Sequence, residues 1–384
     1  SNSIDYVGAW YFKACELVKG TNTKCAFVST NSITQGEQVA PLWKTLYERY
    51  NVNINFAYRT FRWDSESSEK AHVHCVIIGF SACNDELVLA SPKIIFDEAG
   101  TAHEAKNINA YLIDAPMIFV ESTAKPICDV QPMYLGNKPA DGGNLILSSD
   151  EVVEILKTEP ELKQYIKRYV GADDYINNKL RYCFWLKNVP PSALRKSKEL
   201  KQRIEKVREM RLASTAKPTR QMADQPHLFF FISQPETNYL LVPSTSSFRR
   251  RYIPVGFMSP DVIASNAATI IPNATLYDFG IITSNVHMAW MRVVCGRLKS
   301  DYRYSNSIVY NTFPWPKSTD EQKAKIEQTG KMILDTRTKY PDESLADLYD
   351  ETFMPPDLRK AHRDNDRAVM EAYGFAGTKG HAPL

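Results

Sequence analysis

The sequence lacks the features that mark membrane-spanning, secreted and zinc-binding proteins. No apolar run approaches the roughly 18 residues of a membrane-spanning helix, and no secretory signal opens the chain. The seven cysteines are scattered, are odd in number and include no CxxC pair. This spacing excludes a zinc ribbon and a disulfide frame, so it predicts reduced thiols in a cytoplasmic protein without a membrane partner.

The common catalytic motifs are missing as well. The sequence contains no GxGxxG, no phosphate-binding GxxxxGK[ST], no zinc-binding HExxH and no GxSxG nucleophile turn. His72 and His74 would lie on one face of a strand, but no third metal ligand accompanies them. We therefore expect no metal site.

What is present fits a soluble protein of two or three domains. The chain has 384 residues, of which 43% are hydrophobic and 24% are charged, and its formal net charge is +3. This length is enough to bury a sizeable core in each domain.

The residue pattern of the N-terminal part predicts an α/β sheet. Apolar residues at helical spacing predict a helix over 4–19, and the short apolar run 24–30 predicts a strand buried on both faces. A second helix is expected over 37–49, followed by two strands over 53–61 and 71–80. This order indicates the second half of an α/β sheet with an antiparallel pair at its edge.

The rest of the chain divides into an irregular middle part and a helical end. From about residue 90 to 300, turn-rich pieces alternate with helical stretches and β-like runs, which indicates a mixed α+β domain. Ser318 and Glu321 then form a capping-box sequence, and the helix behind it is expected to reach Tyr340. A last helix is expected to end at Gly374.

Basic residues are concentrated in three clusters of the middle part. Residues 195–220 contain ten Lys or Arg against three Glu, residues 248–252 read FRRRY, and residues 291–305 interleave Lys and Arg with tyrosines. Cations neutralise phosphates, and aromatic rings stack on bases. One basic helix alone is commonly a solvated surface, whereas three clusters in one domain indicate nucleic-acid binding.

Several long stretches carry a family resemblance. They are, in chain order, DYVGAWYFKA, AFVSTNSITQGEQV, FAYRTFRWDSESSEKAHVHCVIIGF, SSFRRRYIPVGF, FGIITSNVHMAWMRVVCGRLKSDYRYS, IVYNTFPWP and SLADLYDETFMPPDLRKAH. Together they cover nearly the whole chain. In this order they resemble the amino-methyltransferases that modify adenine in DNA, and more closely the MmeI-like single-chain restriction-modification enzymes of types IIG and IIL.

The resemblance implies a fold of three parts. Residues 3–95 resemble the C-terminal part of a Rossmann-like class I methyltransferase sheet, residues 96–302 a mixed DNA target recognition domain, and residues 303–384 a helical C-terminal domain. The expected fold class is therefore α/β plus α+β.

The resemblance also implies a reaction. Such enzymes transfer a methyl group from S-adenosylmethionine directly to adenine N6 in double-stranded DNA. This sequence contains neither the family's Gly-rich donor-binding loop nor its Asn-Pro-Pro-aromatic motif, since VPPSA (189–193) and MPPDL (354–358) lack the amide residue. We therefore expect a C-terminal fragment that binds no cofactor and methylates nothing by itself. Its expected partners are DNA and the upstream part of the same polypeptide. In enzymes of this family that upstream part can also carry an endonuclease.

Two residue pairs in the first part are candidate pocket residues. Extruding adenine from a duplex costs a few kcal/mol, and stacking on an aromatic ring returns about 1–3 kcal/mol per base. In related enzymes an aromatic side chain at this hairpin contacts the extruded base, so the role falls on Phe61 or Trp63, with Phe61 preferred. The alternative is packing against a neighbouring domain. The segment DYVGAW resembles one that lines the methyl-donor pocket, which makes Asp5 and Tyr6 candidate cofactor-binding residues.

The candidate DNA-binding residues come from the three basic clusters. Phe248 and Arg250 are expected to project from one face of a strand toward base edges, with Arg249 and Arg251 turned toward phosphates. The alternative for these arginines is ion pairing with the catalytic domain. The other candidates, for contacts to the DNA backbone or to bases, are Lys201, Arg208, Arg211, Arg297, Lys299, Arg303 and Tyr304.

Two other functions fit the same sequence. The first is a non-catalytic DNA-binding specificity module that acts with a separate catalytic subunit, and an Asn-Pro-Pro-aromatic motif upstream of Ser1 would exclude it. The second is an RNA methyltransferase, which competition between duplex DNA and duplex RNA would test.

Overall fold

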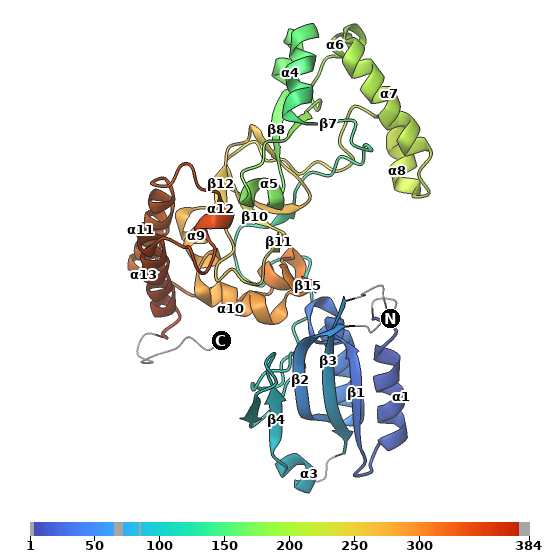
Figure 1. Cartoon of the computed structure of the whole chain (residues 1–384), viewed down its shortest axis with the longest axis vertical. Helices are drawn as coiled ribbons and strands as arrows, with labels where there is room; N and C mark the ends of the chain where they lie inside the picture. The colour runs from blue at the N-terminus through green and yellow to red at the C-terminus, as the bar shows by residue number, and fades with distance from the viewer. Residues whose placement is uncertain (1–3, 65–71, 84–85, 376–384) are drawn as a thin grey trace. The chain divides into compact units, whose positions relative to one another are not determined.

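The computed structural model describes residues 4–64, 72–83 and 86–375 (Figure 1). Its contacts divide the chain into two compact units. Unit 1 comprises Ser1–Cys128 and Ala289–Pro314, and unit 2 comprises Asp129–Met288 and Trp315–Leu384. None of the helices in the described ranges combines the length and the apolar composition that crossing a bilayer requires.

Unit 1 is built on a five-stranded sheet with the strand order β1-β3-β2-β4-β5. Neighbouring strands are antiparallel, except that β2 and β4 are parallel. Its first segment contains α1 (Gly8–Val18), β1 (Lys24–Thr30), α2 (Thr45–Tyr50), β2 (Val52–Asp64), β3 (His72–Ala82), α3 (Glu86–Ala90), β4 (Lys93–Phe96) and β5 (Ala102–Ala105). Its second segment contains β15 (Gly296–Leu298), β16 (Asp301–Arg303) and the π-helical turn η6 (Asn306–Tyr310).

Two expectations about this sheet are wrong. The strand expected to be buried on both faces, β1, lies at the sheet edge beside β3, and alternate side chains such as Ala26 and Val28 are exposed. The antiparallel pair expected at the edge, β2 and β3, lies inside the sheet between β1 and β4. A short apolar run indicates a strand but does not reveal how many neighbours that strand has.

The two strands expected over 53–61 and 71–80 are confirmed and are longer than predicted. Because β2 continues to Asp64, Phe61 and Trp63 are strand residues and do not belong to the loop that follows. Their orientation is therefore fixed by the pleat of the sheet.

The single helix expected over 37–49 is broken into three pieces. A 3-10 turn (Gly36–Gln38, η2) and a π-helical turn (Ala40–Lys44, η3) precede α2. Gly36 has a φ of 61°, and Pro41 has no backbone N–H to donate, so neither residue supports a regular helix.

Unit 2 contains two four-stranded sheets, with the orders β13-β8-β9-β7 and β12-β10-β14-β6. Their strands are β6 (Tyr134–Leu135), β7 (Ile146–Leu147), β8 (Ile166–Val170), β9 (Tyr182–Phe184), β10 (Tyr239–Pro243), β12 (Gly256–Met258), β13 (Val262–Ala264) and β14 (Ala268–Pro272). Between them lie α4 (Ser149–Thr158), the 3-10 turn η4 (Pro160–Tyr165), α5 (Ala172–Ile176), α6 (Pro191–Lys196), α7 (Lys198–Leu212), α8 (Lys217–Gln221) and the short strand β11 (Thr245–Ser246).

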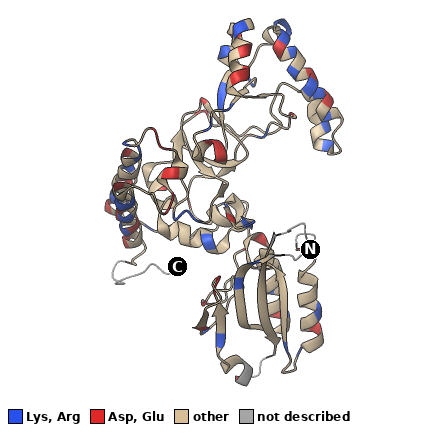
Figure 2. Ribbon diagram, viewed as in Figure 1, with Lys and Arg blue, Asp and Glu red and all other residues tan. Residues whose placement is uncertain are grey.

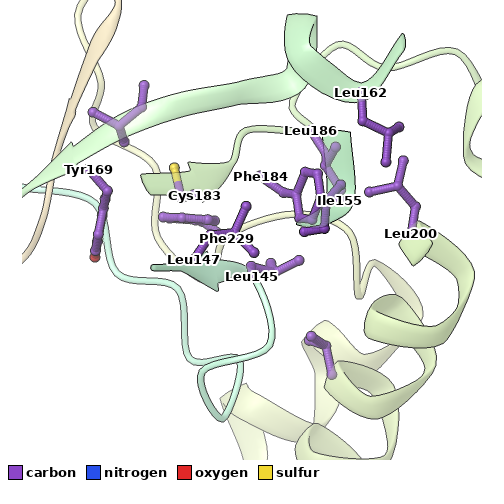
Figure 3. Close-up of a cluster of buried hydrophobic side chains, with 12 residues drawn as sticks. Leu145, Leu147, Ile155, Leu162, Tyr169, Cys183, Phe184, Leu186, Leu200 and Phe229 are labelled. Atoms are coloured by element: carbon purple, nitrogen blue, oxygen red, sulfur yellow. The ribbon is translucent and has the colours of Figure 1, made fainter. Parts of the chain in front are cut away.

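The first of these sheets has a hydrophobic core of its own with α4 and α7 (Figure 3). Ile155 of α4 and Leu200 and Val207 of α7 belong to one buried cluster with Leu147 and Phe184 of the strands. The basic segment 195–220 is thus anchored through its apolar residues, which leaves its other side to solvent.

The remaining helices of unit 2 are α9 (Leu276–Ile282), α11 (Asp320–Arg337), α12 (Leu345–Leu348) and α13 (Pro356–Ala372), and α10 (Asn285–Val294) carries the chain onward into unit 1. A Cβ added to Gly280 would lie 2.5 Å from Cγ2 of Ile326, so α9 and α11 are in close contact. The capping box of α11 is formed by Thr319 and Gln322, one residue later than predicted.

The predicted end of the last helix is confirmed. Helix α13 stops at Ala372, and Gly374 follows with a φ of 74°, a conformation that glycine adopts without strain. With its several small sheets and helices the chain is a mixed α/β protein.

Candidate nucleic-acid interface

Phe61 and Trp63 form an aromatic pair on one face of β2. Their ring centroids are 6.3 Å apart with an interplanar angle of 49°. Phe61 is half-buried opposite Cys75, whereas Trp63 lies opposite Val73 and is 52% exposed. The sheet therefore presents one ring that its neighbours hold in place and a second ring that is open to a planar partner.

Asp5, a candidate residue for binding the methyl donor, is linked by hydrogen bonds to the cross-strand row of the sheet that contains Phe61. Thr30, the last residue of β1, is opposite Cys75, which is itself opposite Phe61. Thr30 shares a hydroxyl–hydroxyl hydrogen bond of 3.0 Å with Ser32, and Ser32 Oγ donates to Asp5 Oδ2 at 2.6 Å. Asp5 is exposed, and its backbone N–H donates to Gln38 Oε1. The carboxylate is thus oriented by a hydroxyl and accessible.

The hairpin of β15 and β16 packs beside the segment that follows β1. A Cβ on Gly36 would lie 3.2 Å from Cα of Gly296, and Ser307 Oγ donates to Glu37 Oε1 at 2.6 Å. The hairpin turn carries Lys299, and β16 ends at Arg303. Both side chains are exposed, so cationic groups accompany the aromatic pair within unit 1.

Arg297 is occupied inside this hairpin. Its guanidinium lies 4.1 Å from the ring centroid of Tyr302 and donates to the backbone oxygens of Arg292 and Ser300. The side chain therefore stabilises the hairpin that presents Lys299 and Arg303.

The prediction that Tyr304 contacts DNA is contradicted by its burial. Tyr304 is only 2% exposed, and desolvation raises the pKa of its hydroxyl well above the ordinary value of 10.0. Along this alternating segment the side chains of Tyr302 and Tyr304 are buried, and the side chain of Arg303 between them is exposed.

The three consecutive arginines lie in a turn, not in the strand that was predicted. Strand β11 ends at Ser246, and the backbone N–H of Arg250 donates to Ser247 O at 3.1 Å. The alternating arrangement expected for Phe248 and Arg250 therefore does not apply, because a turn has no two-residue periodicity. We call residues 247–251 the arginine loop.

The side chains of the arginine loop are nevertheless accessible. Phe248, Arg249 and Arg251 are exposed and Arg250 is half-buried. The guanidinium carbon of Arg249 lies 5.9 Å from the ring of Phe248, and that of Arg251 lies 5.8 Å from the ring of Tyr252. These aromatic contacts orient the guanidinium groups of Arg249 and Arg251.

Lys and Arg occur along the whole of α7 (Figure 2), and their exposure divides them into an outer and an inner set. Lys201 and Arg208 are exposed. Arg208 lines a polar hollow with Glu205 and Asp224, and its Nη1 lies 3.9 Å from Glu205 Oε1. Lys201 is therefore the clearer phosphate-binding candidate, since two carboxylates accompany Arg208.

The prediction that Arg211 binds DNA is wrong. Its side chain is 0% exposed and donates five hydrogen bonds to backbone oxygens, those of Pro139, Ala140, Met222, Gln225 and Leu228. A guanidinium carries five N–H donors in a fixed fork, so this arginine joins three chain segments that would otherwise bury unpaired carbonyl groups. Sequence offers no sign of this, because Arg211 shares its basic segment with exposed cations.

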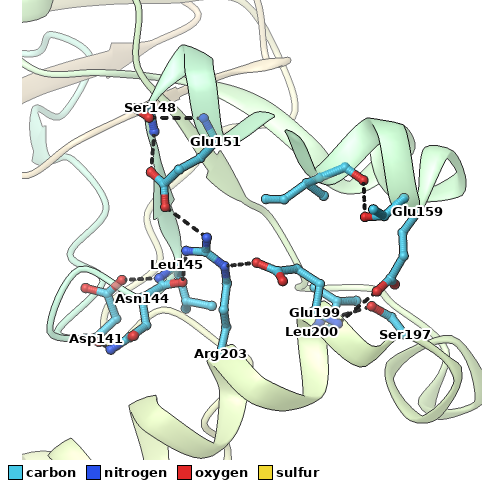
Figure 4. Close-up of polar contacts among 12 residues, drawn as sticks. Asp141, Asn144, Leu145, Ser148, Glu151, Glu159, Ser197, Glu199, Leu200 and Arg203 are labelled. Carbon is cyan, nitrogen blue, oxygen red and sulfur yellow. Dashed lines mark hydrogen bonds and ion pairs between the residues drawn. The ribbon is translucent and has the colours of Figure 1, made fainter. Parts of the chain in front are cut away.

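Arg203 has a similar inward role that the sequence did not reveal (Figure 4). It is 15% exposed, donates to Glu199 Oε1 at 2.5 Å and to Glu151 Oε1 at 2.9 Å, and also donates to Asn144 O. Glu151 is held in turn by the capping box that it forms with Ser148. The network links α7 to the start of α4.

Similarity to known proteins identifies the family of this chain. Three family models match consecutive parts of the chain: the MmeI DNA-methyltransferase domain over residues 1–95, the MmeI target recognition domain over 114–317 and the MmeI C-terminal domain over 318–382. The chain therefore belongs to the MmeI family, which confirms the resemblance drawn from the sequence.

Two individual proteins extend this result. DNA methyltransferase A of Bacillus subtilis (strain 168) is 39% identical over 371 residues, which are 96% of this chain and 41% of that protein. A solved structure of the type IIL restriction-modification enzyme MmeI in complex with DNA is 47% identical, with a TM-score of 0.92 over 97% of this chain and 50% of that one. The chain thus spans about half the length of these relatives or less.

Proposed function

We propose that this chain is the C-terminal part of a site-specific DNA adenine-N6 methyltransferase of a restriction-modification system. The observation that carries the proposal is that the solved relative, which shares this fold across nearly the whole chain, is in complex with DNA. The proposal includes the Rossmann-like origin of the sheet in unit 1 and the domain limits 3–95, 96–302 and 303–384.

The aromatic pair gives unit 1 its role in this proposal. An extruded adenine exposes two aromatic faces, and the ring of Trp63 is accessible while Phe61 supports it. Stacking of about 1–3 kcal/mol per base offsets part of the few kcal/mol that unstacking costs. An accessible ring that is already held in one orientation therefore favours base extrusion, because no ordering of the ring is needed when the base binds.

S-adenosylmethionine supplies the methyl group in methyltransferases of this kind. We place Asp5 and Tyr6 on the donor side of the pocket. Carboxylates in nucleotide-binding folds accept hydrogen bonds from ribose hydroxyls, and Asp5 already accepts one from the hydroxyl of Ser32. Tyr6 is 82% exposed, so its ring is available to cover a ligand.

The DNA-binding residues fall into two functional groups. Lys201, Lys299 and Arg303 are exposed cations and are proposed to neutralise phosphates, with a weaker contribution from Arg208. The arginine loop is proposed to read bases, because a guanidinium that bridges guanine O6 and N7 discriminates by roughly 1–3 kcal/mol. Arg297 supports the first group from inside its hairpin.

Binding of duplex DNA by the 384-residue chain tests the proposal directly. We expect fluorescence anisotropy with a labelled duplex to show binding that weakens steeply with salt, with a slope of about −0.9 for each phosphate contact. Unlabelled duplex DNA should compete more strongly than duplex RNA of the same sequence. Equal competition by RNA would contradict the DNA assignment.

The same chain is expected to be inactive when it is supplied with labelled S-adenosylmethionine and duplex DNA. The sequence lacks the Asn-Pro-Pro-aromatic motif whose hydrogen bonds make the amine electrons available. Methyl transfer by the isolated chain would refute this part of the proposal. It would also exclude the alternative that the chain is a specificity module for a separate catalytic subunit.

A further inference from the structure

The arginine loop is followed directly by a buried segment, residues 252–255. Tyr252, Ile253 and Val255 have almost no exposed surface. The last arginine of the loop, Arg251, is covalently joined to the first residue of this segment, so whatever holds Tyr252 also sets where the loop ends and how it is directed.

Helix α13 contacts Tyr252 through two side chains that are one turn apart. The ring of His362 stacks on the Tyr252 ring with a centroid distance of 4.2 Å and an interplanar angle of 25°. The Tyr252 hydroxyl donates to Asp366 Oδ2 at 2.7 Å. Residues four apart on a helix lie on the same face, so α13 fixes both the ring plane and the end of this tyrosine.

The second oxygen of the same carboxylate holds the start of α10. Asp366 Oδ1 accepts from the backbone N–H of Asn285 at 2.7 Å. An N–H at the first residue of a helix has no partner within the helix, and a carboxylate there also interacts favourably with the helix dipole. One side chain of α13 therefore joins the arginine-loop segment to the helix that leads toward the β15–β16 hairpin.

Helix α11 holds the other end of the buried segment. Arg337 Nη1 donates to Val255 O at 2.6 Å, and its Nε donates to the Tyr349 hydroxyl at 2.7 Å. The Tyr349 hydroxyl is in turn 2.8 Å from His362 Nε2. Burial and the nearby Arg337 charge hold the pKa of His362 well below its ordinary value, so the ring that stacks on Tyr252 is neutral.

From these contacts we infer that Arg337, His362 and Asp366 are positioning residues for sequence recognition. This inference rests on the proposed DNA-binding function and deepens it. A guanidinium discriminates between DNA bases by two hydrogen bonds of fixed direction. A loop whose ends are not anchored samples many conformations, so its arginines lose this selectivity. The C-terminal helices therefore contribute to the choice of DNA site through their contacts with Tyr252 and Val255.

Two conservative substitutions and one matched control test the inference in the 384-residue chain. Tyr252→Phe removes only the hydroxyl, and Asp366→Asn removes the charge while it keeps the shape. Asp364→Asn is the control, because Asp364 lies on the same helix and its ion-pair partners, Lys360 and Arg367, are exposed. Thermal unfolding of all three variants measures any general loss of stability.

Two readouts separate positioning from stability. Hydrogen–deuterium exchange of a peptide covering residues 245–256 reports whether the loop is still held. Selection from a randomised duplex library reports the preference for selected over unselected DNA. We expect Tyr252→Phe and Asp366→Asn to speed exchange in the loop and to lower the preference about five- to tenfold, the effect of one net hydrogen bond. Both variants should bind unselected duplex as tightly as the wild type does. The Asp364→Asn control should match the wild type in both readouts.

Unchanged exchange in both variants would overturn the inference, and so would faster exchange with an unaltered DNA preference. A uniform loss of binding to all duplexes, parallel to a fall in melting temperature, would also overturn it. A wild-type chain with no preference among duplexes would refute the proposed function itself. That result differs from the case in which the wild type is selective and the variants remain equally so.

Discussion

Arg208 and Arg211 lie one helical turn apart on α7 and have opposite surroundings. Arg208 is exposed at the edge of a polar hollow, whereas Arg211 has no exposed surface and donates to five backbone oxygens. A charge count along the sequence assigns both residues to one nucleic-acid surface. Their environments assign the first to solvent and the second to the framework of unit 2.

Truncation of Arg211 is expected to destabilise the chain severely. Arg211→Met would leave buried carbonyl groups without donors, and we expect the free energy of unfolding to fall by about 3–5 kcal/mol. Arg208→Met should change it by less than about 0.5 kcal/mol. Urea denaturation followed by circular dichroism measures both. An Arg211→Met chain as stable as the wild type would show that the five hydrogen bonds are dispensable.

Substitutions in the arginine loop and on α7 should have different effects on DNA binding. We expect Arg250→Ala to change the preferred sequence, with a loss of roughly 1–3 kcal/mol at one base pair. Lys201→Ala should weaken binding to all duplexes alike and reduce the salt slope by about 1. Selection from a random duplex library combined with salt titrations separates the two. An unaltered site preference in Arg250→Ala would reject the base-reading role of the arginine loop.

The aromatic pair can be tested with a fluorescent base. We expect a duplex with 2-aminopurine opposite an abasic site to be quenched when it binds the chain, because the base can stack on Trp63 without disrupting a base pair. Trp63→Ala and Phe61→Ala should reduce the quenching and cost about 1–3 kcal/mol in affinity for this duplex.

A matched control for this experiment is Phe353→Ala, which removes another exposed aromatic ring, 78% accessible, from unit 2. It should leave the quenching unchanged. Quenching that persists in both Trp63→Ala and Phe61→Ala would show that the extruded base stacks at another site.

Acid sensitivity should depend in part on Glu151. The backbone N–H of Ser148 and then the Arg203 guanidinium lower the pKa of this carboxyl from its ordinary value of 4.5. The folded chain therefore binds this proton less tightly than the unfolded chain does. The stabilisation is complete above about pH 4.5 and is lost as the pH falls through the lowered pKa.

Melting temperatures from about pH 7 to about pH 3 measure this contribution. We expect Glu151→Gln to be less stable than the wild type at neutral pH and to show a smaller loss toward acid. Glu154→Gln, an exposed position on the same helix, is the control and should follow the wild-type curve. Identical pH profiles for Glu151→Gln and the wild type would contradict the role of the network.

The sequence predicted those parts of the fold that local pattern determines. The strands β2 and β3 and the helix that stops before Gly374 follow from periodicity and from a glycine that tolerates a positive φ. The edge position of β1 could not be predicted, because strand order depends on pairing between distant segments. The apolar spacing of residues 37–49 predicts one continuous helix, whereas Gly36 and Pro41 interrupt it.

The sequence predicts which residue types form the candidate DNA-binding surface, but it does not show which individual residues are exposed there. Lys201, Lys299 and Arg303 are exposed as a DNA-binding role requires, whereas Tyr304 and Arg211 are buried. Exposure depends on which face of an element packs. A short hairpin carries too little periodicity to show this for Tyr304, and on α7 Arg211 shares its basic segment with exposed cations. The contacts of Asp366 with Tyr252 and Asn285 join residues more than eighty positions apart, and no local signal marks them.

The contacts around Asp366 also restrict how recognition segments can be exchanged between relatives. Tyr252 and Asn285 belong to the part that matches the target recognition domain, while Asp366 belongs to the part that matches the C-terminal domain. A chimera spliced between these two parts takes the tyrosine from one parent and the carboxylate from the other. The proposed positioning role predicts that a transplanted specificity depends on the matching residues of α11 and α13.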